Sequence, residues 1–245
     1  MERARLSRYG LLSVSGDDAR EFLHAQLTND VRNLPAARAA LAGWCSAKGR
    51  LLASFLVIPA PQGFLLQLAR DLAAPVAKRL AMFVLRSKVK IADVSEGWAQ
   101  LGLWGEELNQ PDVAWEGEIV TVRVGDKRFL RAGPAAALAA LSADASEETW
   151  ALQEIRAGRP LISAATQDLF VPQMVNLEAL GGIDFRKGCY PGQEIVARAQ
   201  YRGQVKRRLF HLQAPAGAKL RPGEEYDGGV VLDSAGGELL AVKPV

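Results

Sequence analysis

The chain has few residues of the kinds that build disulfide frameworks and metal centres. Its 245 residues include two cysteines, Cys45 and Cys189, and two histidines, His24 and His211. Two cysteines exclude a disulfide framework and fit a reducing compartment. A zinc ion or iron–sulfur cluster held by one chain normally needs about four cysteine, histidine or carboxylate ligands. Because these four residues are scattered without ligand spacing, we predict no metal centre held by this chain alone.

Long apolar segments are also missing. The longest hydrophobic run, residues 51–60, is far shorter than the roughly 20 residues that cross a bilayer. The basic N-terminal segment MERARLSRYG is not followed by an apolar stretch of signal-peptide length. These absences predict a cytoplasmic protein with no membrane partner. The apolar fraction of 49% is large enough for the core of one large domain or two modest ones.

Charge is nearly balanced over the whole chain but not along it. The net charge of +3 is too small to favour non-specific nucleic-acid binding by the protein as a whole. Residues 186–208 hold seven Arg and Lys residues and one acid, Glu194, so this segment carries +6 and the remainder −3. Such a basic segment suits a small anion or a short RNA, and it is equally typical of a solvated strand face.

Hydrophobic periodicity predicts an irregular alternation of strands and helices. Helices are expected at residues 15–31, 71–86, 134–142 and 146–157. Ser15 or Asp17 is the predicted cap of the first helix and Asp71 that of the second. Strands are expected at residues 9–16, 88–95 and 99–105, and hairpins at 49–69 and 118–133. This order predicts an α+β fold rather than a doubly wound parallel sheet.

The C-terminal residues differ from the rest of the chain in their sequence pattern. From about residue 204 the sequence has short β-compatible runs, frequent Gly and Pro turns and no helical period. This pattern predicts a small all-β module at residues 204–245, which follows a larger α+β region at residues 1–203.

The segment GGIDFRKGCYPGQEIVARAQYRG, residues 181–203, contains Cys189 two residues after Lys187. A lone cysteine is more often a small buried residue than a reactive one. If the segment is extended, however, these two side chains share a face and the ammonium group favours the thiolate. Gly188 and Gly192 would let a ligand or another backbone approach. We therefore predict Cys189, with Lys187, as the reactive group, although no histidine lies near it in sequence to act as a base.

The core of this segment, KGCYPGQE at residues 187–194, resembles the signature of the YgfZ-type folate-binding proteins. These are relatives of the glycine-cleavage T-protein that assist iron–sulfur enzymes. Residues 15–31, which end in QLTNDV, and residues 45–57, CSAKGRLLASFLV, are similar to the same family. The resemblance implies a ring around a folate-sized central cavity, with two lobes in residues 1–203 and a small β-barrel-like module at residues 204–245.

The resemblance also implies a cofactor and partners. The cofactor would be tetrahydrofolate or a related folate. The partners would be iron–sulfur client enzymes or cluster carrier proteins, and tRNA modification would involve RNA only indirectly. The implied function is that of an accessory protein for assembly or repair of iron–sulfur clusters in client enzymes, with Cys189 as the reactive thiol.

Residues in positions that match the family make up the predicted folate site. Aromatic rings would contact the pterin and benzoyl groups, and arginines would form a basic mouth for the glutamate tail. The predicted cofactor-binding residues are Asn29, Asp30, Lys48, Arg50, Arg156, Tyr190, Gln193, Glu194, Arg198, Tyr201 and Arg202. Arg198 and Arg202 are the expected mouth. Asn and Asp residues such as Asn29 and Asp30 are equally common as helix caps and loop residues.

Two departures from the T-protein limit the expected chemistry. Where the T-protein has a Gly-Gly-x-x-Asp-Asp strand that aids one-carbon transfer, this chain has Ala53 and Ser54 in place of the acids. Where the T-protein has a glutamate that grips the pterin, this chain has Arg156. Classical catalytic activity is therefore not expected. A folate-dependent aminomethyl transferase and an RNA-associated module stay open as alternatives.

Overall fold

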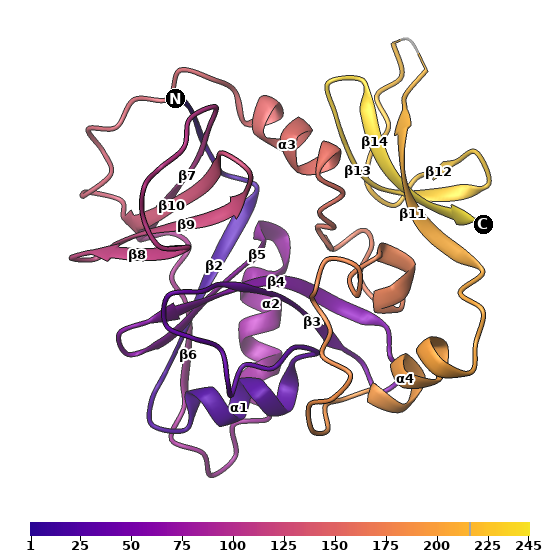
Figure 1. Cartoon of the computed structure of the whole chain (residues 1–245), viewed down its shortest axis with the longest axis horizontal. Helices are drawn as coiled ribbons and strands as arrows, with labels where there is room; N and C mark the ends of the chain where they lie inside the picture. Colours follow the sequence, from indigo (N-terminus) through magenta and orange to yellow (C-terminus); the bar gives the residue numbers. More distant parts are fainter. Residues whose placement is uncertain (216) are drawn as a thin grey trace.

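Three antiparallel sheets make up most of the structure, a computed structural model that describes residues 1–215 and 217–245 (Figure 1). The first sheet has the order β3 (Ala40–Cys45), β4 (Leu51–Ala60), β5 (Gly63–Ala69), β2 (Tyr9–Ser15), β6 (Lys90–Asp93). The second has the order β1 (Glu2–Arg5), β7 (Trp98–Trp104), β10 (Arg128–Pro134), β9 (Ile119–Gly125), β8 (Val113–Glu116). The C-terminal sheet has the order β11 (Arg207–Gln213), β14 (Glu238–Pro244), β13 (Gly229–Ala235), β12 (Glu225–Tyr226).

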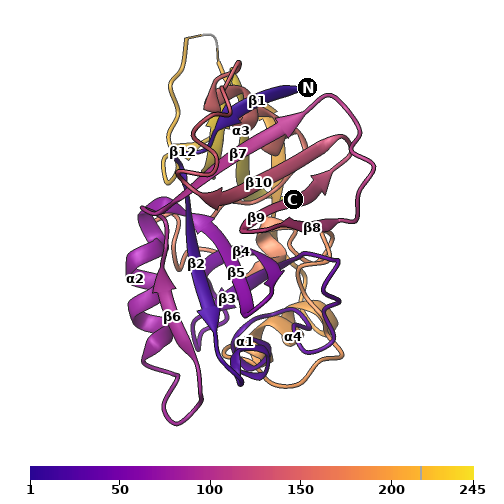
Figure 2. The ribbon, with the colours of Figure 1, turned by 90° about the vertical axis from the view of Figure 1, so that its left-hand side faces the viewer.

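Short helices connect and cover these sheets. They are α1 (Ala19–Gln26), α2 (Arg70–Ala81), α3 (Glu147–Arg156), the 3₁₀ helix η1 (Pro172–Val175) and α4 (Gln193–Tyr201). Helices α1 and α2 pack on the first sheet, whereas α3 contacts both β1 of the second sheet and β13 of the C-terminal sheet. In both views α1 and α4 lie at the same end of the molecule, away from β1 and α3 (Figures 1 and 2).

Strand β4 lies at the centre of the core. All of its residues except Ala60 are buried, because the first sheet is covered on both faces. Phe55 and Val57 belong to the core formed with α1 and α2, whereas Leu56 and Ile58 pack against the second sheet. A continuous apolar run is what a strand buried on both faces requires. Burial of each such side chain stabilises the fold by about 1.5–3 kcal/mol.

Several elements confirm the predictions from sequence, among them the α+β class. The hairpin at residues 49–69 is β4 with β5, and the hairpin at 118–133 is β9 with β10. Helix α3 begins after Ser146, whose side chain accepts a hydrogen bond from the backbone N–H of Thr149. It ends before Gly158, which has a left-handed φ of +65°, as expected for a glycine that follows a helix.

The helix predicted at residues 134–142 is wrong. Strand β10 extends to Pro134, and the alanine-rich residues after it form turns that bury Leu138 against the second sheet. A helix in so short a segment would have to meet the cost of nucleation for few hydrogen bonds.

The helices predicted at residues 15–31 and 71–86 form as α1 and α2, but their predicted boundaries and caps are wrong. Helix α1 is limited to Ala19–Gln26 because the next residue, Leu27, is extended and forms a β-bridge with Trp44. The residue before it, Asp18, makes no capping bond with its side chain, which accepts instead from the backbone N–H of Lys88. Asp71 lies within the first turn of α2 and accepts from the backbone N–H of Ala164.

The C-terminal sheet is formed entirely by residues 207–244, and the boundary between residues 203 and 204 stays a prediction. Arg8, in the loop between β1 and β2, forms an ion pair of 2.6 Å with the buried Asp233 of β13. This pair joins the C-terminal sheet to the loop before β2. Arg156 makes a second link, to Glu238, at 2.6 Å. None of the helices in the described residues is long and apolar enough to cross a membrane.

Candidate functional site

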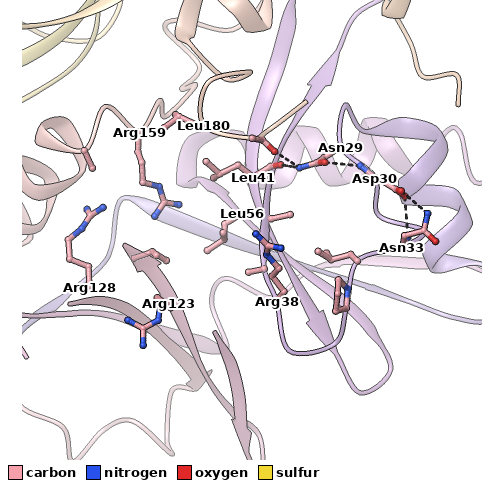
Figure 3. Close-up of a pocket in the computed structure, with 17 residues that line it drawn as sticks. Asn29, Asp30, Asn33, Arg38, Leu41, Leu56, Arg123, Arg128, Arg159 and Leu180 are labelled. Atoms are coloured by element: carbon pink, nitrogen blue, oxygen red, sulfur yellow. Dashed lines mark hydrogen bonds between the residues drawn. The ribbon is translucent and has the colours of Figure 1, made fainter. Parts of the chain in front are cut away.

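A cavity of about 560 Å³ lies between the first and second sheets (Figure 3). Both polar and apolar side chains line it. They come from the residues after α1, the loop before β3, strands β3 and β4, the β9–β10 hairpin and the segments after α3 and η1: Asn29, Asp30, Asn33, Leu34, Arg38, Leu41, Leu56, Arg123, Val124, Arg128, Arg159 and Leu180. Segments far apart in the sequence therefore form the wall of a single cavity.

Four arginines and one acid give the cavity wall a net positive charge. Arg128 and Arg159 share the buried carboxylate of Glu154, at 2.7 and 3.3 Å. Arg123 pairs outside the cavity, with Glu107 and with Asp112.

Within the described part of the chain, no ion pair involves the fourth arginine, Arg38, and its side chain is exposed. Figure 3 shows Arg38 and Arg159 directed into the space beside Leu41 and Leu56. An anionic ligand would find one unpaired guanidinium there and two more that Glu154 holds in place.

Asn29 and Asp30 form one end of the cavity. The Asn29 amide donates to the carbonyls of Leu41, at 2.7 Å, and Gly181, at 2.8 Å, so it ties the end of α1 to β3 and to the chain after η1. Asp30 accepts from the backbone and the side chain of Asn33, at 3.1 and 2.7 Å. The two side chains thus build this corner and also face the cavity.

The cysteine segment lies beside the end of α1. Lys187 is buried, and its ammonium group donates to the carbonyl of His24 and, at 2.6 Å, to that of Leu27. It also lies 4.9 Å from the centre of the Tyr190 ring. Carbonyls at a helix C-terminus lack partners within the helix and attract cations. Burial lowers the pKa of Lys187 to about 8, against the opposing effect of Asp30 and Asp184.

Cys189 is exposed, whereas Lys187 is buried. The segment does not form a regular strand, because the chain bends at Lys187 and has no regular structure up to Tyr190. By contrast, Cys45 is buried at the end of β3, and burial raises the pKa of its thiol to about 12. The two cysteines thus occupy opposite environments.

Gly192 holds the other end of the cysteine segment. Its φ is +76°, and a Cβ there would lie 2.4 Å from the carbonyl oxygen of Ser46 and 2.6 Å from the Cα of Gly49. Only glycine allows both this conformation and this close approach. Gly188 has no such requirement, because the nearest atom to a Cβ at that position is His24 Nε2, at 3.9 Å.

The structure brings only some of the predicted folate residues together. Asn29 and Asp30 line the cavity, whereas Arg50 donates to carbonyls of residues 168 and 169, and Lys48 is exposed in the turn after β3. Tyr190 is buried under Lys187.

The remaining predicted residues lie on α3 and α4. Arg156 pairs with Glu238, and Gln193 opens α4. A separate hollow of about 220 Å³ is lined by Glu194, Ala197, Arg198, Tyr201 and Arg202. The proposed mouth residues Arg198 and Arg202 are therefore absent from the described lining of the large cavity. The predicted site as a whole stays a prediction.

Comparison with known proteins places the chain in a family, although no protein-family model matches it. The chain is 35% identical over 235 residues to the tRNA-modifying protein YgfZ of Edwardsiella ictaluri, an alignment that covers 86% of the chain and 71% of that protein. It is 32% identical over 243 residues to the protein of the same name from Serratia proteamaculans, covering 91% and 74%. The chain belongs to the YgfZ family.

The fold of this YgfZ-family chain is also that of a solved enzyme. It superposes on the glycine cleavage system aminomethyltransferase T of Bartonella henselae with a TM-score of 0.76 and 18% identity, covering 99% of the chain and 78% of the enzyme. At this identity the likeness shows the fold alone. The predicted T-protein-like architecture is thereby confirmed.

The two positions predicted to match the acids of the T-protein are buried in β4 of the YgfZ-family chain. Ala53 is fully buried, and the Ser54 hydroxyl donates to the carbonyl of Pro160, at 3.1 Å, and accepts from the backbone N–H of Ile162, at 3.0 Å. Ser54 thus fastens β4 to the segment after α3.

Sequence reasoning missed the cavity arginines Arg38, Arg123, Arg128 and Arg159. They are spread over residues 38–159, and none of them belongs to the basic segment that stands out in the sequence. Arg159 follows Gly158 directly after α3, so the turn at the end of that helix was a usable signal. Arg123 and Arg128 lie on the predicted β9–β10 hairpin, and they face Arg38 only through the packing of the second sheet on the first.

Proposed function

We propose that this protein binds a reduced folate in the arginine-lined cavity and assists assembly or repair of iron–sulfur clusters in client enzymes. The observation that carries the folate proposal is the cavity itself. Its volume of about 560 Å³ falls in the range of small-molecule sites, roughly 300–1,000 Å³. Its combination of apolar wall and arginines suits a ligand with flat apolar rings and an anionic tail.

The lining residues fit the parts of a folate. Leu41, Leu56 and Val124 offer apolar surface for the pterin and benzoyl rings. Arg38 and Arg159 offer charged hydrogen-bond donors for the carboxylates of the glutamate tail, in place of the mouth expected at α4. A bound reduced folate would supply the capacity to carry one-carbon units. The protein would supply position and charge.

The iron–sulfur part of the proposal is supported by family membership and by the cysteine segment. Cys189 is exposed, and its segment is held at one end by the bonds of Lys187 to carbonyls at the end of α1 and at the other by Gly192 against the β3–β4 turn. Such a thiol is placed to exchange with a client protein. In this proposal the cluster belongs to the client. An effect on tRNA, which the relatives' names describe, would then be indirect and pass through client enzymes that modify tRNA.

A binding titration tests the folate site. Calorimetric titration of tetrahydrofolate under reducing conditions should give saturable binding to the wild type. Arg38→Gln should raise Kd about tenfold, since a charged hydrogen bond is worth roughly 1.5–3 kcal/mol. The matched variant Arg198→Gln, on α4, should leave Kd unchanged. No saturable binding would remove folate from the proposal, and a loss with Arg198→Gln alone would move the tail to the hollow on α4.

A cellular experiment tests the cluster role separately. Activities of iron–sulfur enzymes are compared in cells that carry the wild type, Cys189→Ala or Arg198→Gln. We expect Cys189→Ala to lower these activities while the purified variant still binds tetrahydrofolate. Unchanged activities with Cys189→Ala would refute the role of this thiol, and turnover of an aminomethyl donor by the wild type would favour the transferase alternative.

A further inference from the structure

We propose that His24 is the proton acceptor for the Cys189 thiol and that Asp30 positions the His24 ring. This inference rests on the reactive role proposed for Cys189, but not on folate binding. No histidine lies near Cys189 in the sequence, where Lys187 is its only candidate activator. The structure offers a different side chain for that task.

The first observation is an unpartnered buried nitrogen. The His24 side chain on α1 is only 6% exposed, and its Nε2 atom has no hydrogen-bond partner among the described residues. A buried polar atom without a partner costs about 1–3 kcal/mol. Such atoms are rare in folded proteins and call for an explanation. Here the rest of the ring is well held, so the free nitrogen is not the result of a loosely packed side chain.

The second observation is the orientation of the ring by Asp30. His24 Nδ1 lies 3.1 Å from Asp30 Oδ1, and Asn33 fixes the carboxylate with two hydrogen bonds. Burial would raise the pKa of Asp30, but the bonds from Asn33 and the nearby imidazole outweigh it and hold the pKa below its usual value. An ionised Asp30 accepts a hydrogen bond from the Nδ1–H of His24, which leaves the lone pair on Nε2.

The backbone N–H of Arg32 lies 3.3 Å from the same Nδ1 atom and competes for it. This contact is longer than the one to Asp30, and it lacks the negative charge that strengthens a hydrogen bond from Nδ1–H. The carboxylate therefore decides the tautomer. In this arrangement Cys189 is the nucleophile, His24 is its base, and Asp30 is the third group that orients the base.

The third observation is the direction of Nε2. A Cβ at Gly188 would lie 3.9 Å from this nitrogen, and no other atom beyond the neighbouring residues would come within 4 Å of it. Gly188 has no side chain to separate the ring from the segment. The next residue is Cys189, one Cα step of about 3.8 Å along the chain, and its thiol is exposed to reagents.

Lys187 does not serve as the acceptor. Its ammonium group donates to the carbonyls of His24 and Leu27, and a protonated amine has no lone pair to receive a proton. Its charge still favours the thiolate at a distance. Lys187 therefore stabilises the thiolate by its charge, and His24 provides the lone pair that accepts the proton.

Four charged groups face His24: Lys187 from the cysteine segment, Arg32 and Asp30 from the residues after α1, and Glu21 from α1 itself. Burial, followed by the charges of Lys187 and Arg32, lowers the pKa of His24 against the opposing effect of Asp30 and Glu21. His24 is therefore neutral near pH 7, which is the form that can accept a proton.

The proton and electron pairs balance in a simple alkylation. The S–H bond of Cys189 breaks, its proton passes to His24 Nε2, and the bonding pair stays on sulfur. The imidazolium ion that forms is stabilised by Asp30. The thiolate then attacks the methylene carbon of iodoacetamide, a C–S bond forms, and iodide leaves. With a protein disulfide, the same thiolate would attack sulfur and release the other thiolate.

The test is the rate of iodoacetamide labelling of the Cys189 peptide between pH 5.5 and 9.5, read by mass spectrometry on the full-length protein. At pH 7 His24→Gln should be about tenfold slower than the wild type, with its profile displaced to higher pH by about one unit. Asp30→Asn should lie between the two. The matched control Asp17→Asn, an exposed carboxylate before α1, should match the wild type.

The buried Cys45 reports the fold in the same samples, because its peptide stays unlabelled as long as the core is intact. A His24→Gln profile that superposes on the wild type, with Cys45 protected, would overturn the proposal. If Cys45 becomes labelled, ¹⁵N chemical shifts of His24 in the wild type decide instead. A proton on Nδ1 supports the proposal, whereas a proton on Nε2 overturns it. Neither readout uses folate, so failure of the folate site would not affect them.

Discussion

Substitution of Gly192 by alanine adds only one methyl group, but it should lower the free energy of unfolding more than such a small change normally does. Gly192 connects the cysteine segment to α4 and lies against the turn between β3 and β4. A Cβ at this position would meet the carbonyl oxygen of Ser46 at 2.4 Å and the Cα of Gly49 at 2.6 Å. Both are backbone atoms, which cannot rotate away as the end of a flexible side chain would. Either the turn or the start of α4 must move.

The cost can be divided with a matched variant. Gly158 has a similar left-handed φ of +65°, but a Cβ there would meet nothing within 4 Å. A non-glycine residue in this conformation costs about 1–2 kcal/mol, and the stiffer unfolded chain returns roughly 0.4–1 kcal/mol. Gly158→Ala should therefore lose about 1 kcal/mol. Gly192→Ala adds the overlap, and overpacking typically costs about 1–3 kcal/mol, so we expect a loss of about 3 kcal/mol.

Urea denaturation followed by circular dichroism measures both variants, and thermal unfolding gives a second reading. For a chain of this length roughly 2–4 °C of Tm corresponds to 1 kcal/mol, so Gly192→Ala should lower Tm by about 9 °C and Gly158→Ala by about 3 °C. Equal losses would show that the close approach at Gly192 costs nothing. The division of the cost given above would then be wrong.

Three further outcomes are expected. Arg8→Met should lower the free energy of unfolding, measured by urea denaturation, by about 3–5 kcal/mol because it leaves the buried Asp233 without its partner. Arg198→Met, which removes one member of an exposed pair, should lower it by under about 1 kcal/mol. Similar losses for the two variants would contradict this reasoning. Because the pKa of Lys187 is lowered to about 8 in the folded state, the folded protein binds fewer protons than the unfolded chain between pH 8 and 10.5. The unfolding free energy of the wild type relative to Lys187→Met should thus rise by about 2 kcal/mol from pH 8 to 9.5, and a constant difference would exclude the shift. Iodoacetamide at pH 7 should label Cys189 far faster than Cys45, whose pKa burial raises to about 12; comparable rates would show that Cys45 is not protected.

The local elements were predictable from the sequence because each depends on neighbouring residues. The apolar run of β4 and the glycine-bracketed hairpins follow from periodicity and turn chemistry. The cap at Ser146 and the end of α3 before Gly158 follow from the hydrogen bonds that helix termini need. The family was also readable from KGCYPGQE at residues 187–194, because this motif is long enough to be specific.

Local patterns failed where a tertiary contact competes with them. The alanine-rich residues after Pro134 have high helix propensity, yet they form turns because β10 continues to Pro134 and Leu138 packs on the second sheet. Propensity contributes tenths of a kcal/mol per residue, and the burial of one leucine contributes about 1.5–3 kcal/mol. The stronger effect decides.

The candidate sites depend still more on tertiary structure. Spacing alone put Lys187 beside Cys189, but α1 has unpaired carbonyls at its C-terminus, and these draw the ammonium group into the interior. The same packing brings His24, more than 160 residues away in sequence, to Gly188. Arg38 and Arg159 face one cavity only because the sheets that carry their segments pack together. A sequence pattern indicates which face of an element is buried, but a contact between distant segments is determined by how those faces pack.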